Sequence, residues 1–192
     1  YSYCAANPIR YIDPTREDIW RINGKGEVVE HTVTQDFDKF EFVDKDNNII
    51  KNDQGEEQVL QFEYGTVSHK KETYNNVKSG NHGDISGQYD LFTVKGDRNG
   101  TELFEMFSNN VTAKSGNEIG LIRTGELGKG TNYVTSAQVK SSEPGGPTLF
   151  HNRLKNGYFV REITHSHHDI ISASKNDRLS HQQILRYYSH SN

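Results

Sequence analysis

Thr164-His165-Ser166-His167-His168-Asp169 is the stretch around which this chain is organised. It follows an apolar run, residues 158–163, that predicts a β-strand. Because side chains alternate between the two faces of a strand, His165 and His167 should project from the same face, a few ångströms apart. Two imidazoles placed in this way can both bind one metal ion.

A second polar cluster follows the histidines. Ser174-Lys175-Asn176-Asp177 leads into residues 177–188, which read as a terminal helix. Asp177 can supply a third metal ligand if the chain turns after the strand and the helix start brings this carboxylate back. The S-x-x-D spacing also resembles a capping box, in which case Ser174 and Asp177 would only start the helix. Asp169 shares the face of the two histidines and could replace Asp177 as the ligand.

Composition narrows the classes of protein. The 192 residues suit one domain with an appendage, and the hydrophobic content of 32% predicts a modest core with many loops. No apolar run approaches the ~20 residues needed to span a bilayer. The net charge is −4 with both signs interspersed, so no nucleic-acid-binding face is indicated. A single cysteine, Cys4, excludes an internal disulfide and a thiolate cluster, so a metal site would have to use His and carboxylates.

The N-terminal half reads as β-hairpins followed by a loop. Asn23-Gly24 between two apolar-containing runs is a strong hairpin signal, and residues 40–43 and 58–64 predict further strands. Residues 44–48, D-x-D-x-N, resemble the start of a calcium loop, but the Gly and Glu that such a loop needs later are missing, which favours a plain turn. Residues 65–90 are polar and are predicted to form a long loop.

The C-terminal half mixes helices and strands. The pattern predicts a short helix over residues 101–108 that ends at Asn109-Asn110, a buried strand over 117–125, a half-exposed strand over 133–140 and a Gly/Pro loop over 141–147. We therefore predict an α+β fold. It should consist of a mixed β-sheet with flanking helices, preceded by an N-terminal extension rich in β-hairpins.

A hydrolytic zinc site also needs an open position for water and a general base. Glu118 is the best candidate for the base, because it lies at the start of a predicted core strand. A carboxylate beside Ile119 and Leu121 is otherwise hard to explain. Glu126 and Glu102 are the alternatives, in which case Glu118 would be a surface residue of an edge strand.

The first fourteen residues, Y-S-Y-C-A-A-N-P-I-R-Y-I-D-P, resemble the C-terminal border of the RHS-repeat-associated core. In that family the core repeats form a large β-shell, and the segment after the border is a variable toxin domain. The resemblance implies that residues from Asp18 onward are a toxin tip of a secreted effector. This toxin domain would act in the cytoplasm of a target cell, and a cognate immunity protein would neutralise it in the producing cell. Because the chain starts with Tyr1 rather than Met, we expect it to be a fragment of a longer polypeptide.

The remainder of the chain resembles the JAB/JAMM (MPN-type) metalloprotease superfamily. The family order is a helix, a strand that opens with Glu and a nearby Gly, a second strand, an H-x-H strand, and S-x-x-D leading into a helix. The matching parts here are residues 101–108, Glu118-Ile119-Gly120, residues 133–140, His165-Ser166-His167 and Ser174-Lys175-Asn176-Asp177. The Pro that usually follows the second His is replaced by His168.

This resemblance implies a role for each site residue. His165, His167 and Asp177 would bind Zn²⁺. Glu118 would activate the attacking water, and Ser174 would support the oxyanion. The chain would then divide into the end of the RHS core at residues 1–17, a β-rich N-terminal part of the toxin at 18–95, and a JAB/JAMM-like metallopeptidase core at 96–192.

Two functional classes follow from these residues. The first is a metal-dependent hydrolase, a peptidase or isopeptidase toxin acting on a protein or peptide in the target cell. The second is a catalytically inactive JAB-like module that binds and blocks a target protein. A His-based nuclease is a weaker third class, because the sequence shows no basic face to hold a phosphate backbone.

Overall fold

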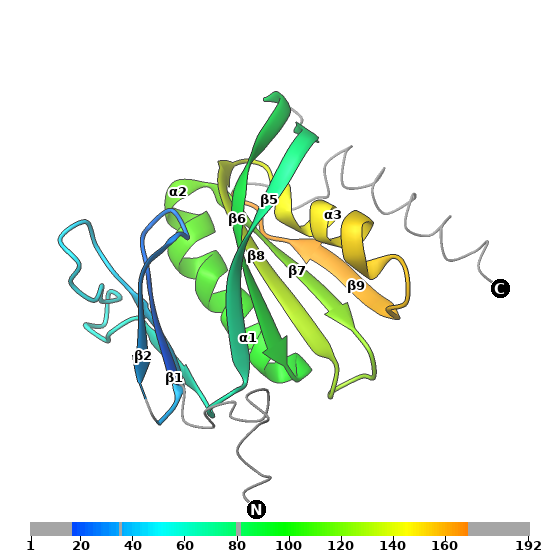
Figure 1. Cartoon of the computed structure of the whole chain (residues 1–192). Coiled ribbons are helices and arrows are strands. Elements are labelled where there is room, and N and C mark those ends of the chain that lie inside the picture. Colours follow the sequence, from blue (N-terminus) through cyan, green and yellow to red (C-terminus); the bar gives the residue numbers. More distant parts are fainter. Residues whose placement is uncertain (1–16, 35, 80–81, 169–192) are drawn as a thin grey trace, which may run out of the picture.

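The computed structural model describes residues 17–34, 36–79 and 82–168. Over these residues the protein has an α+β fold, with two β-sheets and helical segments on both faces of the larger sheet (Figure 1). The predicted fold class is confirmed at this level. The RHS-like border, Cys4, Asp169, Ser174 and Asp177 lie outside the described residues.

The smaller sheet has four strands in the order β2-β1-β3-β4. They are β1 (Glu17–Ile22), β2 (Val28–Thr34), β3 (Asp38–Phe42) and β4 (Val59–Phe62). β1 pairs with β3 in parallel and with β2 antiparallel, so this sheet is mixed. Its inner face presents Trp20 and Phe40, both fully buried, whose rings stack with centroids 4.8 Å apart.

Asx turns close the connections of the smaller sheet. The predicted hairpin at Asn23 is confirmed: its side-chain oxygen accepts hydrogen bonds from the backbone N–H of Lys25 and Glu27, at 2.9 and 3.1 Å. Asp44 does the same for Asp46 and Asn48, both at 2.9 Å. Local hydrogen bonds of this kind account for the D-x-D-x-N sequence as a turn.

The larger sheet has five strands in the order β5-β6-β8-β7-β9, and every pair in it is antiparallel. Its strands are β5 (Val67–Ser79), β6 (Gly83–Lys95), β7 (Asn117–Thr124), β8 (Thr131–Lys140) and β9 (Val160–His165). β5 and β6 are therefore strands of the sheet that carries the histidines, and this sheet continues across the boundary that we drew at residue 96.

The prediction of a loop over residues 65–90 is wrong, because β5 and β6 form a long hairpin there. The outer part of this hairpin extends beyond the rest of the sheet (Figure 1). Both of its faces are therefore largely exposed, and its sequence lacks the alternation that marks a half-buried strand. Nearer the body of the sheet, Tyr74, Tyr89 and Leu91 are buried.

One helical run covers one face of the larger sheet. It consists of α1 (Asp97–Phe107), the π-helical turn η1 (Ser108–Thr112) and α2 (Ala113–Ser115). The predicted end at Asn109-Asn110 is wrong. Asn110 is buried, and its side-chain amide donates to the Met106 carbonyl at 3.0 Å, which accommodates it inside the run. The run ends instead at Gly116, in the left-handed conformation with φ 74°.

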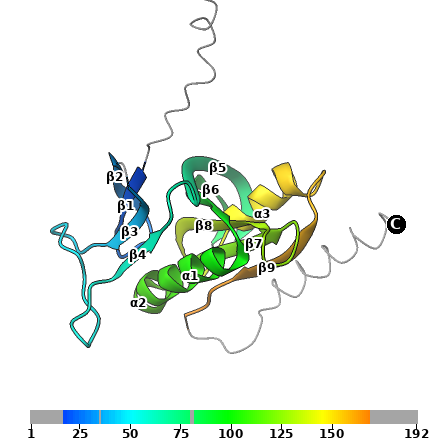
Figure 2. The ribbon, with the colours of Figure 1, turned by 90° about the horizontal axis from the view of Figure 1, so that it is seen from below.

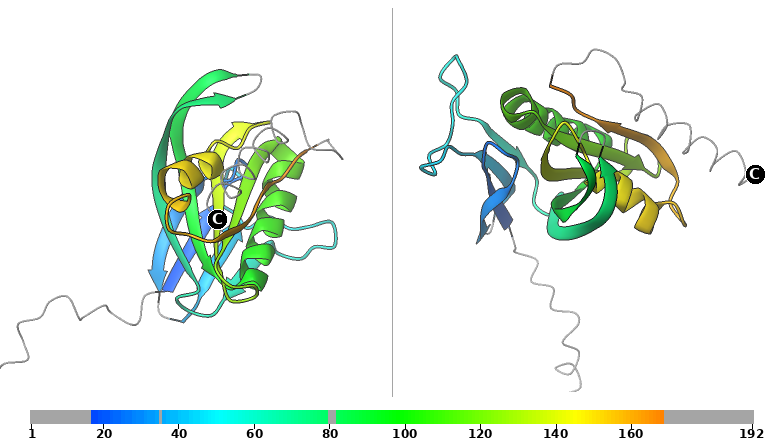
Figure 3. Two further views of the ribbon diagram at one scale, coloured as in Figure 1. Left: turned by 90° about the vertical axis from the view of Figure 1, so that its right-hand side faces the viewer. Right: turned by 90° about the horizontal axis from the view of Figure 1, so that it is seen from above.

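A second helical segment covers the opposite face (Figures 2 and 3). It consists of α3 (Gly145–Leu149) and the π-helical turn η2 (Phe150–Leu154). The core accordingly has two parts. One lies between α1, the smaller sheet and the larger sheet, around Phe92 and Phe107, and the other lies beneath α3, around Tyr89 and Leu149. We call these two sides of the larger sheet the α1 face and the α3 face.

Candidate metal centre

Strand pairing brings the H-x-H motif to Glu118. β9 pairs with β7 in a register that places His165 opposite Gly120, and the Ser166 backbone N–H continues the ladder by donating to the Ile119 carbonyl at 2.9 Å. Two residues further along this register, His167 falls opposite Glu118. Residues two apart on a strand share a face, so all three polar side chains project from the α3 face.

The three side chains converge at the end of the sheet. His167 Nδ1 lies 3.2 Å from Glu118 Oε1, and His165 Nε2 lies 3.8 Å from Glu118 Oε2. The two imidazole rings have centroids 4.5 Å apart. One nitrogen or oxygen of each residue can be chosen so that all lie within 4.8 Å of one another. The prediction that the two histidines share a face and lie close together is therefore confirmed.

This geometry fits a metal ion. Ligand atoms bound to one tetrahedral Zn²⁺ lie about 3.3 Å apart, given metal–ligand bonds of about 2.0–2.1 Å. The observed separations of 3.2 and 3.8 Å need only small side-chain rotations to reach that arrangement. Glu118 is 7% exposed, and the histidines are half-buried, so the group is open to solvent on the histidine side. Glu118, His165 and His167 could together hold a metal ion.

The residue between the two histidines anchors them. Ser166 Oγ accepts a hydrogen bond from the Ile119 backbone N–H at 3.0 Å and contacts Thr112 Oγ1 at 2.6 Å. Thr112 Oγ1 donates to the Asn117 carbonyl at 2.8 Å, so Ser166 is the donor in the contact with Thr112. The Thr112 carbonyl also accepts from His168 Nδ1 at 3.1 Å. The helical run on the α1 face therefore fixes the backbone from which the two histidines project.

A β-bulge lies beside Glu118. The β7–β8 ladder pairs Asn117 with Lys140 and Ile119 with Ser136. Between these two pairs, β7 has one residue, Glu118, and β8 has three, residues 137–139. Within this bulge Gln138 adopts φ 56°, which is uncommon for a residue other than Gly, Asn or Asp. Bulges re-aim side chains and are frequent next to active sites.

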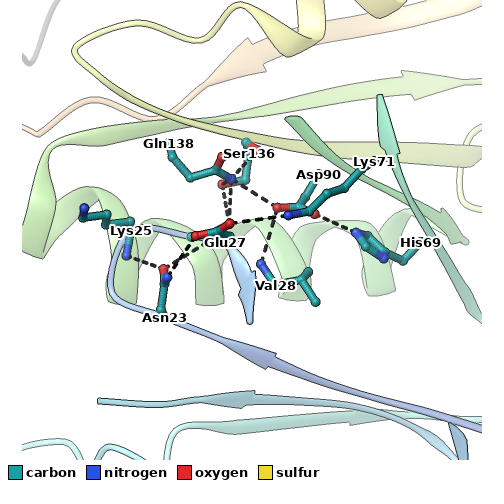
Figure 4. Close-up of polar contacts among 10 residues, drawn as sticks. Asn23, Lys25, Glu27, Val28, His69, Lys71, Asp90, Ser136 and Gln138 are labelled. Carbon is teal, nitrogen blue, oxygen red and sulfur yellow. Dashed lines mark hydrogen bonds and ion pairs between the residues drawn. The ribbon is translucent and has the colours of Figure 1, made fainter. Parts of the chain in front are cut away.

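A polar seam supports the bulge from the smaller sheet (Figure 4). The buried Asp90 carboxylate accepts hydrogen bonds from Gln138 Nε2 at 3.2 Å and from the Val28 backbone N–H at 3.4 Å. It also contacts His69 Nε2 at 2.8 Å. Gly26 lies against Ser136 of β8, whose hydroxyl donates to the Gly26 carbonyl at 2.7 Å. Residues of β2, β5 and β6 thus share one network with the bulge residue.

A second carboxylate on the α3 face was missed by the sequence analysis. Glu143 precedes α3 and accepts hydrogen bonds from Thr135 Oγ1 at 2.8 Å and from the Gly146 backbone N–H at 2.8 Å. Burial raises the pKa of Glu143 to about 7 despite these hydrogen bonds, and the charge of Glu118 contributes to the rise. The signal in the sequence was weak: a lone Glu before Pro-Gly-Gly, where a carboxylate can cap a short helix.

The alternative bases lie elsewhere. Glu102 is on α1 and pairs with Arg98 at 2.8 Å, while Glu126 is exposed in the turn between β7 and β8, at the far end of β7 from Glu118. Of the carboxylates considered for the base, Glu118 is the one that the structure brings to the histidines. Ser174, Asp177 and the alternative ligand Asp169 lie outside the described residues, and their roles stay predictions.

Comparisons of this chain with protein-family models, with curated proteins and with solved structures found no match. Among the described residues, no helix has the length and apolar character needed to cross a membrane. The interpretation of the site therefore depends on its own geometry and on the sequence motifs.

Proposed function

We propose that this protein is a zinc-dependent hydrolase that cleaves an amide bond, as a peptidase or an isopeptidase. The observation that carries the proposal is the convergence of Glu118, His165 and His167 at the end of the larger sheet. Imidazole donors suit zinc, and a catalytic zinc site uses three protein ligands with one open position for water. Glu118 lies close enough to both histidines to act on a water molecule at that position. The order of motifs along the chain supports a JAB/JAMM-like core.

Each residue has a distinct role in this proposal. His165 and His167 hold the ion, together with Asp177 as the third ligand. When bound, Zn²⁺ acts as a Lewis acid toward the scissile carbonyl and lowers the pKa of water. Glu118 takes a proton from the attacking water and returns it to the leaving amine, because its carboxylate lies beside both imidazoles. Ser174 donates a hydrogen bond to the oxyanion of the tetrahedral intermediate.

We also propose that this hydrolase is the toxin domain of an RHS polymorphic toxin. The support is the border sequence of residues 1–14. In this setting the domain is delivered as a secreted effector into a neighbouring bacterial cell during competition, and it cleaves a protein or peptide in the cytoplasm. A cognate immunity protein protects the producing cell.

The test combines metal content with toxicity. We expect about one zinc per chain by elemental analysis of the wild type. His167→Ala should lose both the zinc and the toxicity. Glu118→Gln should retain most of the zinc and lose the toxicity, because it removes the base. Glu126→Gln, at an exposed turn far from the site, is the matched control and should change neither quantity.

The outcomes separate the proposals. Absence of zinc from the wild type, even after reconstitution, contradicts the metal centre and favours a module that binds and blocks a target. Full toxicity of Glu118→Gln in the presence of zinc contradicts the assignment of the base. Zinc binding without hydrolysis of any peptide or isopeptide substrate, and without toxicity, favours an inactive JAB-like domain.

A further inference from the structure

The turn that begins α3 carries a carboxylate that the proposed chemistry does not use. Glu143 Oε1 accepts hydrogen bonds from Thr135 Oγ1 at 2.8 Å and from the Gly145 backbone N–H at 3.0 Å. Its Oε2 accepts from the Gly146 backbone N–H at 2.8 Å. The side chain thereby ties the start of α3 to the middle of β8.

The same carboxylate occupies the space above Gly120 on β7. A Cβ atom at Gly120 would lie 2.7 Å from Glu143 Oε2 and 2.4 Å from Thr135 Oγ1. Both distances are shorter than real Cβ contacts, so the hydrogen-bonded pair fits only over a glycine. Gly146 is restricted in the same way, because a Cβ there would lie 2.6 Å from Glu143 Oε2. With Gly145, where a Cβ would lie 2.9 Å from Glu143 Oε1, the sequence thus provides three glycines that make room for this one carboxylate.

Gly120 lies at a corner of the candidate metal centre. Its same-face neighbour along β7 is Glu118, and its cross-strand partner on β9 is His165. On the other side, the Gly120–Thr135 pair is the regular β7–β8 pair of this face that lies nearest to the bulge at Glu118. Glu143 therefore lies over β7 at Gly120, which is next to Glu118 on this face and opposite His165.

The charge of Glu143 also acts on this site. Burial, with a contribution from the charge of Glu118, raises the pKa of Glu143 to about 7. Tyr74 of β5 and Tyr89 of β6 also interact with it. Burial raises the pKa of both tyrosines, and the charge of Glu143 adds to the rise, for Tyr89 after the larger effect of Glu72. A cation held beside Glu118 would favour the ionised form of Glu143.

We infer that Glu143 is a positioning residue of the metal centre, which holds Gly120, and with it Glu118 and His165, in place from the α3 side of the sheet. The inference rests on the proposed metal centre, and it does not depend on which bond is cleaved. Residues that orient ligands in this way without touching the ion typically contribute tenfold to a hundredfold to metal affinity.

The first measurement needs no metal. The side-chain NMR signals of His165 and His167 are compared at one fixed pH between wild type, Glu143→Ala and Thr148→Val. Thr148 is the matched control because its hydroxyl donates to the Pro144 carbonyl at 2.7 Å in the same turn, whereas the atoms nearest to a Cβ at Gly120 belong to Thr135 and Glu143. Glu143→Ala should shift both imidazole signals, and Thr148→Val should leave them in place.

The second measurement is zinc affinity, determined by competition with a chelator. Glu143→Ala should weaken binding by about tenfold or more, while Thr148→Val stays within about twofold of wild type. Glu143→Gln keeps the size of the side chain and serves if the alanine variant does not fold. At pH 7 the wild type should release up to about half a proton more than Glu143→Gln on binding zinc, because a group with a pKa of about 7 is half protonated there. Calorimetry in two buffers of different ionisation enthalpy measures this difference.

The results distinguish this inference from the proposed function. Unchanged imidazole signals and unchanged zinc affinity in both Glu143 variants would overturn it and leave Glu143 as a cap of α3. If the wild type binds no zinc, the metal centre fails, and the NMR comparison alone then decides whether Glu143 positions the histidines. If both variants and Thr148→Val change equally, α3 as a whole is responsible and the role of Glu143 is rejected.

Discussion

The two faces of the larger sheet are built from alternate residues of the same strands, yet they have opposite characters. Toward α1, Ile119, Leu121 and Val134 are at most 1% exposed and pack into a continuous apolar core. Toward α3, their neighbours Glu118 and Thr135 are polar and surround a glycine. A single strand such as β7 therefore provides apolar packing on one face and a residue of the candidate metal centre on the other, and the well-packed face allows the opposite face to hold buried polar groups.

The apolar packing of the α1 face is tested most directly by removing one of its aromatic rings. Phe107 is fully buried, and its ring lies 5.2 Å from that of Phe42 and 5.4 Å from that of Phe92, centroid to centroid. Phe107→Ala should lower the free energy of unfolding by about 3–5 kcal/mol in a denaturant titration, because it leaves a cavity between the two sheets. Phe159→Ala, at a residue that is 70% exposed, should cost less than about 0.5 kcal/mol. Equal effects of the two variants would contradict this description of the core.

Zinc should stabilise the α3 face through the histidines. At a concentration one hundred times the dissociation constant, binding adds about 2.7 kcal/mol to the free energy of unfolding. The midpoint temperature of thermal unfolding of the wild type should therefore rise when zinc is added and return to its starting value when a chelator removes the zinc. His165→Ala should show no such rise, although its metal-free stability stays close to that of the wild type, because His165 is half-buried at the end of a strand. An equal zinc effect in His165→Ala would remove this residue from the site.

A methyl group at Gly120 tests the tight packing of the α3 face. Gly120→Ala should lower the free energy of unfolding by about 1–3 kcal/mol, because its Cβ would meet Glu143 and Thr135 and force them to move. Gly24→Ala is the control, since a Cβ there meets nothing within 4 Å. The same urea titration measures both variants. A Gly120→Ala protein as stable as the control would show that Glu143 and Thr135 do not restrict the space above β7 at this position.

The last expected effect is a slope of stability with pH. The pKa of Glu143 is raised to about 7 in the folded protein by burial, so between about pH 4.5 and pH 7 the folded state binds more protons than the unfolded state. The free energy of unfolding of the metal-free protein should therefore fall as the pH rises through this window, by at most about 1.4 kcal/mol per pH unit from this group. Glu143→Gln should lack that component, and an identical slope in both proteins would contradict the raised pKa.

The parts of the fold that could be predicted are those set by local patterns. The apolar run of residues 158–163 predicts a strand that leads into the H-x-H motif with both histidines on one face, and the Glu118 carboxylate stands out beside apolar Ile119 and Leu121. Both predictions depend on neighbours in the sequence. The structure then brings these elements together through the β7–β9 pairing.

The parts that could not be predicted depend on distant contacts. The β5–β6 hairpin has a polar sequence because its outer part has little to pack against on either face. The helical run passes Asn109-Asn110 because Asn110 is satisfied by Met106 within the run and by Gln58 from another part of the chain. The environment of Glu143 requires Thr135 and Gly120, which only the folded sheet brings beneath it.

The buried residue Asp90 has a consequence for how this domain can be cut or transplanted. Its carboxylate receives hydrogen bonds from Val28 of the smaller sheet and from Gln138 of the bulge beside Glu118. A fragment that began at Gly96 would retain Gln138 and the histidines but would lose Asp90 along with β5 and β6. The smallest segment that could be grafted onto another carrier with its site intact therefore starts at β1, and the N-terminal sheet must be exchanged together with the site.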